Sequence, residues 1–141
     1  MTEVWFYISN DASDGARALL LRRLLERAQQ SARHLHIHTR DESAATRLDQ
    51  WLWQPSSSFL PHGLVDGEQA NKQSVVIGHG ASPGQSHDVL VNLDQQVPDF
   101  FSRFKRVVEL VSGNEKDRQT SRERWKYYRD RGYHVTKHEL G

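Results

Sequence analysis

The sequence of 141 residues contains no cysteine, only four prolines, and nearly equal numbers of basic and acidic side chains, 19 and 18. Without cysteine the chain has no disulfide bond, no thiolate nucleophile and no cysteine-ligated zinc, which fits the reducing cytoplasm where we expect it to work. A formal net charge of only +1 argues against the widely spread positive charge of direct nucleic-acid binders. No apolar run approaches the roughly 18 residues that a membrane helix needs.

The first ten residues include an acid and no basic residue, so we expect no signal peptide. A chain of this length buries a sizeable core, and the sequence shows no internal repeat and no change of texture typical of a second domain. We therefore expect one globular domain over residues 1–141, without contact with a membrane.

Apolar periodicity predicts alternating strands and helices in the first half. The run at 4–8 is almost wholly apolar, as in a strand buried on both faces, and residues 34–38 alternate like a second strand. Apolar residues recur at helical spacing over 16–28 and again over 44–52, where residues 39–42 match a capping box. This order predicts an α/β fold, with a mainly parallel sheet and crossover helices on both of its faces.

The second half begins with a polar segment, 55–74, which we interpret as a long surface loop of the kind that often carries function. Pro98 suits the first turn of a short helix, whose three phenylalanines would pack inward. Asn114 is a suitable N-cap for a last helix, with Gly132 as its C-terminal stop. Further strands are predicted at 75–78, 88–93 and 106–111, and the tail after Gly132 is either an edge strand or loose.

The last predicted helix concentrates positive charge. Residues 116–131 hold seven Lys or Arg against three acids, a local net charge of +4 in a chain of +1. At about 100° per residue, one stripe of this helix carries an aromatic among cations: Arg118, Arg122, Trp125, Lys126 and Arg129. Such a stripe suits an anionic partner that also offers an apolar group. The alternative is a solvated basic face with the tryptophan in the core.

Trp53 and Phe59 form a second candidate surface. Trp53 points well over 90° away from the apolar centre of its helix near Leu48, and Phe59 lies in the polar segment that follows. Large apolar groups without an internal place often mark a partner surface. The alternative is a small satellite cluster beneath the loop.

Catalytic and metal-binding patterns are weak. His34, His36 and His38 would face one side of a strand, but no nearby carboxylate completes a zinc site, and histidines on an edge strand are ordinary. The sequence has no phosphate-loop, nucleophile-elbow or zinc-protease motif. We therefore expect no metal, no cofactor and no catalytic residues.

Three segments, in order, resemble one known family. They are the opening Phe6-Tyr7-Ile8, the stretch RLDQWLWQPSSSFLPHGL at 47–64, and the closing RERWKYYRDRGY at 122–133. Taken together, the chain is similar to the chi subunit of bacterial DNA polymerase III, nearly from end to end. Trp125 stands where the family usually has tyrosine, the stretch between Trp53 and Phe59 is a residue shorter, and residues 65–87 diverge.

The resemblance implies a single Rossmann-like α/β domain that lacks a nucleotide site and acts without chemistry of its own, as an accessory subunit. It also implies two partners, the psi subunit, which ties chi to the clamp loader, and the acidic C-terminal tail of single-stranded-DNA-binding protein. The tail would bind the basic stripe, and psi would bind Trp53 and Phe59.

A different class of function stays open. The same basic stripe could bind single-stranded nucleic acid directly, with an aromatic ring for stacking. The near-neutral chain argues against this alternative, so we expect contact with nucleic acid to be mostly indirect.

Overall fold

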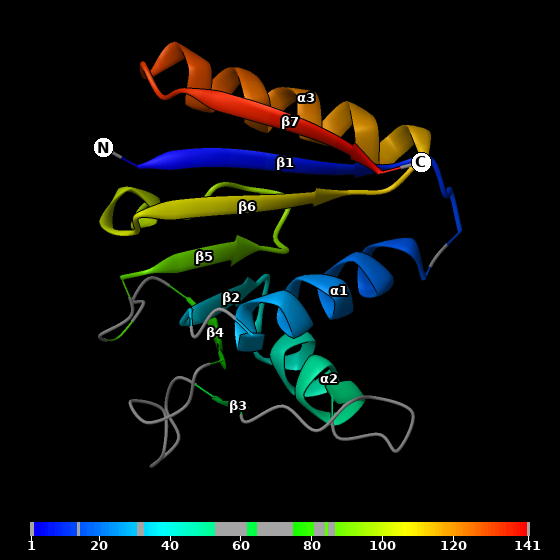
Figure 1. The fold of residues 1–141 in the computed structure, drawn as a ribbon, viewed down its shortest axis with the longest axis vertical. Helices are drawn as coiled ribbons and strands as arrows, with labels where there is room; N and C mark the ends of the chain where they lie inside the picture. Colours follow the sequence, from blue (N-terminus) through cyan, green and yellow to red (C-terminus); the bar gives the residue numbers. More distant parts are fainter. Residues whose placement is uncertain are drawn as a thin grey trace.

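The expected parallel sheet forms the centre of the structure, which is a computed structural model (Figure 1). The structure describes residues 2–13, 15–30, 33–52, 62–64, 75–80, 84 and 87–140. Seven strands are hydrogen-bonded in the order β3-β4-β2-β5-β6-β1-β7, and every neighbouring pair is parallel. The prediction of an α/β fold with helices on both faces is confirmed.

The strands are β1 (Glu3–Ser9), β2 (Leu35–Thr39), β3 (His62–Leu64), β4 (Val75–His79), β5 (Val89–Asn92), β6 (Arg106–Val111) and β7 (Val135–Leu140). The helices are α1 (Ala16–Gln30), α2 (Glu42–Leu52), the 3₁₀ helix η2 (Phe101–Arg103) and α3 (Glu115–Asp130).

Right-handed crossovers explain which face each helix covers. The connections from β1 to β2 and from β2 to β3 move toward one edge of the sheet, so α1 and α2 lie on the same face. The connections from β5 to β6 and from β6 to β7 move the opposite way, which places η2 and α3 on the other face.

Alternating side chains of the strands divide the core into two layers. On the α1 and α2 face, Val108 and Leu110 of β6 pack with leucines of α1. On the α3 face, Val107 and Val111 of the same strand pack with the phenylalanines around η2 and with Tyr128 of α3. The prediction that Phe100, Phe101 and Phe104 point inward is confirmed, since each is at most 7% exposed.

The ends of α3 follow from local chemistry. Asn114 caps the helix, since its side-chain oxygen accepts hydrogen bonds from the amides of Lys116 (2.9 Å) and Asp117 (3.3 Å). Gly132 follows the helix with a φ of 84°, a left-handed conformation that favours glycine. Both terminal predictions are confirmed, and β7 shows that the tail forms the edge strand.

The capping box predicted at 39–42 is wrong. Asp41 caps α2, because its carboxylate accepts a hydrogen bond from the amide of Ala44 at 2.8 Å. Thr39 still belongs to β2, and its hydroxyl donates to the carbonyl of Gly78 on β4. The hydroxyl that the capping box would have used is therefore hydrogen-bonded within the sheet.

Three further expectations are corrected. The segment 55–74 is not wholly a loop, since β3 lies within it and pairs with β4. β2 is an interior strand between β4 and β5, so His36 and His38 are buried rather than placed at an edge. β1 is buried on its α3 face only, because Trp5 and Tyr7 on the opposite face are half-buried.

His36 makes the stability of the fold sensitive to acid. Its ring lies 6.0 Å from that of Phe100 and 5.7 Å from that of Phe104. Burial, together with the charge of His38, lowers the pKa of His36 to about 4. The unfolded chain takes up this proton near pH 6.5, so the native state loses stability as the pH falls from 6.5 toward 4, by about 3 kcal/mol in total.

We therefore expect a lower free energy of unfolding in urea at pH 4.5 than at pH 7. His36→Leu should reduce this difference, whereas His34→Gln, at an exposed position, should leave it unchanged. Equal stability of the unaltered protein at both pH values would contradict the prediction.

Candidate functional site

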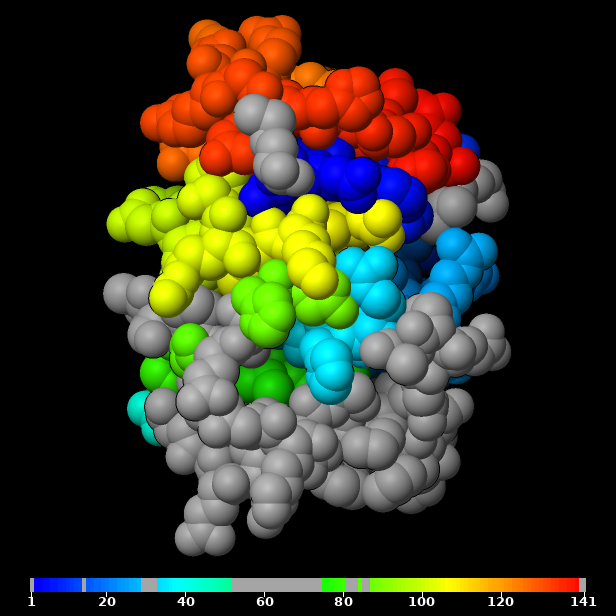
Figure 2. All heavy atoms as spheres, turned by 60° about the vertical axis from the view of Figure 1, so that its left-hand side comes forward, coloured from blue at the N-terminus to red at the C-terminus, as the bar shows by residue number. Residues whose placement is uncertain are grey.

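All five residues of the predicted basic stripe line one pocket between α3 and the sheet. This pocket, named the α3 pocket, has a volume of about 530 Å³. Figure 2 shows α3 and β7 together at one end of the molecule, with β1 and β6 next to them. The lining residues are Phe6, Ile8, Val111, Arg118, Ser121, Arg122, Trp125, Lys126, Arg129, Lys137 and Glu139.

The floor of this pocket is apolar. Phe6 and Ile8 of β1 and Val111 of β6 point to the α3 face, where Phe6 and Val111 belong to the core. Trp125 forms a wall, with its ring 5.0 Å from that of Phe6 at an angle of 55°. Trp125 is half-buried, so its ring is anchored on the core and still faces the pocket. An apolar group that entered here would meet aromatic and aliphatic surface.

Cations surround this floor. The guanidinium of Arg118 reaches the carboxyl end of β1, with long contacts of 3.5 Å to the carbonyl of Ser9 and 3.4 Å to the side-chain oxygen of Asn10. Its Nε is buried and has no hydrogen-bond acceptor among the described residues. Lys126 is exposed, and no carboxylate in the described part of the chain lies within ion-pair distance of it.

The remaining cations make only exposed ion pairs. Arg122 lies 3.7 Å from Glu115, Arg129 lies 3.6 Å from Asp130, and Lys137 lies 3.2 Å from Glu139. Exposed pairs of this kind contribute about 0–1 kcal/mol each, so they compete weakly with an incoming anion. Glu139 is the one acid in the lining, against five Lys or Arg. The pocket is therefore positive at its rim and apolar at its floor.

A buried ion pair holds α3 in place above the sheet. Glu109, in the middle of β6, is completely buried, and its carboxylate accepts a hydrogen bond from Nε of Arg124 at 2.9 Å. The Tyr128 hydroxyl donates to the same carboxylate at 2.7 Å, and the Asn92 amide does so at 2.9 Å. Arg124 also donates to the carbonyl of Gln95. Two residues of α3 are thus tied to β5, β6 and the loop after β5.

Burial dominates the titration of this cluster. It raises the pKa of the Glu109 carboxyl, while the charge of Arg124 and the hydrogen bonds from Asn92 and Tyr128 act in the opposite direction. Burial and the neighbouring Glu109 raise the pKa of the Tyr128 phenol well above its ordinary value, so the phenol stays protonated and donates. Three donors on one carboxylate offset the cost of burying it.

Sequence reasoning missed the role of Arg124 and the contribution of β7. Arg124 was one of seven cations in the basic helix, but it is 4% exposed and faces the core. Its signal was present, since Ser121, Arg124 and Tyr128 lie at helical spacing on a face beside the stripe that is buried. Lys137 joined the pocket only because the tail became a strand.

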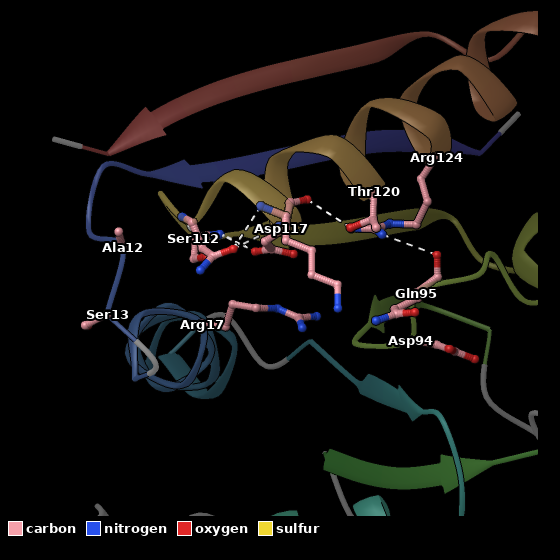
Figure 3. A pocket seen from close by; sticks show the side chains of 11 residues that line it. Ala12, Ser13, Arg17, Asp94, Gln95, Ser112, Asp117, Thr120 and Arg124 are labelled. Atoms are coloured by element: carbon pink, nitrogen blue, oxygen red, sulfur yellow. Dashed lines mark hydrogen bonds between the residues drawn. The ribbon is translucent and has the colours of Figure 1, made fainter.

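A second pocket, of about 250 Å³, opens where β1 and β6 end (Figure 3). The helices that follow these neighbouring strands cover opposite faces, which is the position where doubly wound folds bind ligands. Its lining residues are Ala12, Ser13, Arg17, Asp94, Gln95, Ser112, Asn114, Lys116, Asp117, Thr120 and Arg124.

Internal acceptors already occupy the amides at this crevice. Asn114 takes two amides of the first turn of α3, and the Asp117 carboxylate accepts from the amide of Ser112 at 2.6 Å. Gly113 packs so closely that a Cβ atom would lie 2.4 Å from the carbonyl oxygen of Asn10. A phosphate would have to displace these contacts, which supports the expectation of a fold without a nucleotide site.

Two further sets of sequence candidates remain, the histidines at 34–38 and the pair Trp53 and Phe59. His36 and His38 pack against phenylalanines, and His38 lies 3.5 Å from Asp94. Within the described ranges, no three His, Asp or Glu side chains form a possible metal site. Trp53 and Phe59 lie outside the described residues. Among the helices that are described, none is long and apolar enough to span a membrane.

The fold is that of a Rossmann-like α/β protein, with a pocket beside α3 that is positive at its rim and apolar at its floor. The family model described as "DNA polymerase III chi subunit, HolC" matches residues 1–136. The chain therefore belongs to the family of DNA polymerase III chi subunits, non-catalytic accessory subunits of that polymerase in DNA replication.

The chain is also similar to individual members of this family over most of their length. The chain is 36% identical to the DNA polymerase III subunit chi of Pseudomonas aeruginosa, covering 99% of this chain and 98% of the relative. It is 30% identical to that of Escherichia coli, with 96% of both chains covered. For Haemophilus influenzae the identity is 28%, with 79% and 78% covered.

Removing the cation from the buried cluster should lower the free energy of unfolding substantially. We expect Arg124→Met to lower the free energy of unfolding by about 3–5 kcal/mol, because Glu109 would stay buried without its counter-charge. Tyr128→Phe should cost about 1–3 kcal/mol through one lost donor. The control Arg122→Met, on the exposed side of the same helix, should change stability by less than about 0.5 kcal/mol in denaturant titrations. Equal effects of the two arginine substitutions would contradict this assignment.

Proposed function

We propose that this chi-family protein is an adaptor of DNA polymerase III that binds the acidic C-terminal tail of single-stranded-DNA-binding protein in the α3 pocket. We further propose that it binds the psi subunit through Trp53 and Phe59, and the clamp loader through psi. It would thereby link the polymerase, in the cytoplasm, to coated single-stranded DNA.

The observation that carries the first proposal is the joint lining of one pocket by the five residues of the stripe. The tail, as the resemblance implies it, has several aspartates before a terminal phenylalanine with a free carboxylate. Such a ligand needs cations for its acids and an apolar surface for its ring. The rim of the α3 pocket offers the first, and Trp125 with Phe6 offers the second.

The two kinds of contact differ in strength. Exposed ion pairs contribute about 0.2–1 kcal/mol each and weaken with salt. Burial of the phenylalanine ring should contribute roughly 1.5–3 kcal/mol and does not depend on salt in the same way. The ring is therefore the group that gives specificity, and the cations attract and orient the tail.

The psi proposal rests on the sequence, because Trp53 and Phe59 lie outside the described residues. One structural observation supports it. Leu48 and Trp51 already supply the contacts of the end of α2 with the core, and Arg22 of α1 lies 4.8 Å above the Trp51 ring. The end of α2 thus has an aromatic anchor of its own among the described residues, so the proposal requires no anchoring role for Trp53.

Charge and ring substitutions at the α3 pocket should have different signatures. Arg122→Glu or Lys126→Glu should weaken binding of the tail peptide and flatten its dependence on salt. Trp125→Ala should weaken binding by about 1.5–3 kcal/mol and leave the salt dependence nearly unchanged. Fluorescence anisotropy with a labelled tail peptide, at several salt concentrations, measures both quantities.

Two controls accompany this titration. A peptide that lacks the last phenylalanine should show no measurable binding, and a plain oligonucleotide should bind poorly. If the oligonucleotide binds as tightly as the peptide and loses affinity in Arg122→Glu, the helix is a nucleic-acid surface and the adaptor proposal is wrong.

The psi surface is tested separately. Trp53→Ala and Phe59→Ala should each weaken psi binding by at least about 2 kcal/mol if these residues are hot spots. Thermal unfolding of each variant shows whether the fold is retained, and Trp125→Ala should leave psi binding unchanged. Variants that simply unfold would favour a satellite cluster and contradict the interface.

A further inference from the structure

The face of the sheet opposite the α3 pocket is incompletely covered. Helix α1 leaves the end of β1 and contacts β1 and β6. Its leucines belong to the core cluster that continues over β5 and β2. In Figure 1 no described helix lies over the front of β1 and β7. Trp5 and Tyr7 point to this face and stay half-buried, although the strand is apolar enough for burial on both sides.

A pocket of about 240 Å³ lies between α1 and this part of the sheet. Its inner surface is apolar, with Tyr7, Leu20, Leu24 and Leu110, and the three charged residues that complete it are Arg23, Glu26 and Arg27. Leu24 is half-buried. The volume of the pocket would accept one large side chain.

Apolar surface continues from this pocket along α1. Leu19 is 51% exposed, the most exposed large apolar side chain of the described residues. It lies one helical turn before Arg23, so the two side chains are neighbours on the helix surface. The lining of the pocket and the neighbouring Leu19, together named the α1 groove, combine apolar and cationic groups.

The charge of α1 selects the kind of occupant. Of the four arginines of α1, Arg23 and Arg27 line the pocket together with one acid, Glu26, so its charged lining is net positive. Burial raises the pKa of the Tyr7 phenol, and the charges of Arg106 and Arg27 act in the opposite direction, so both cations lie close to this ring. A second copy of the chain would present the same arginines, and like charges disfavour that contact.

The aromatic rings beside the pocket, Trp5, Tyr7 and His138, argue against a nucleic-acid base as the occupant. His138 of β7 lies 4.7 Å from the Trp5 ring and stacks on Tyr7 at 5.1 Å. The guanidinium of Arg106 covers Trp5 at 3.9 Å. Stacking of a base requires an open ring face, and these faces are already in contact with protein groups.

We propose that the α1 groove is a second docking site, for an acidic protein segment that inserts one large apolar side chain between Tyr7, Leu24 and Leu110. The acids of the segment would lie along Arg23 and Arg27, and its apolar residue would fill the pocket. This site lies across the sheet from the α3 pocket and is independent of it.

The probe is the peptide fluorescein-Asp-Asp-Leu-Glu-Asp-Phe-Asp-Asp-amide, labelled on its N-terminal amine and titrated with the full chain. It carries internal apolar residues and no free terminal carboxylate. Leu24→Asp should weaken binding about tenfold or more, since it places a charge at the mouth of the apolar pocket. Arg23→Glu should weaken it about threefold to tenfold. The matched control is Arg47→Glu on α2, exposed and remote from the groove, which should change binding less than about twofold.

Other outcomes overturn the proposal. Absence of saturable binding overturns it, as does binding that is lost in Arg122→Glu but kept in Leu24→Asp, because the peptide then occupies the α3 pocket. A thymidine oligonucleotide that binds as tightly as the peptide and is sensitive to Arg23→Glu would identify a nucleic-acid surface instead. A dimer in sedimentation that Leu24→Asp converts to monomer would identify a second copy as the occupant.

Discussion

The buried carboxylate of Glu109 fixes the position of α3, and the α3 pocket depends on that position. Arg124 and Tyr128 reach Glu109 together only when the helix has one rotation about its axis and one height along β6. Because successive residues turn by about 100°, this rotation places both Trp125 and Lys126 in the lining of the α3 pocket. An apolar pair in place of the ion pair would tolerate more rotation. The interaction thus contributes orientation as well as stability.

The strand β1 serves both faces of the sheet with alternate side chains. Phe6 and Ile8 form the floor of the pocket below α3, and Tyr7 forms part of the pocket beside α1. A substitution in β1 therefore affects one surface or the other, depending on which face of the sheet the side chain points to. This arrangement allows two separate surfaces to share a strand without competing for the same side chains.

Elements with strong local signals were predictable from the sequence. The strand at 106–111 was predicted with its observed bounds, and Asn114 and Gly132 marked the ends of α3. The stripe could be found because it depends only on helical geometry. The buried role of Arg124 could not, since an arginine is placed in the core by a partner distant in sequence, Glu109. The three-residue β3 is too short for periodicity, and the interior place of β2 depends on strand order, which local patterns do not encode.

Topology also determines where this protein can bind partners. At the carboxyl ends of β1 and β6, where related folds hold ligands, Asn114 and Asp117 occupy the amides of the loop and the helix start. The connection from β6 to β7 must cross β1, so α3 lies over it, whereas the connection from β1 to β2 must leave β1 and carries α1 away. One face of the β1–β7 edge is therefore covered by a helix that leaves a pocket, and the other is left half-open. Binding surfaces at this edge, rather than at the crevice, are what the strand order favours.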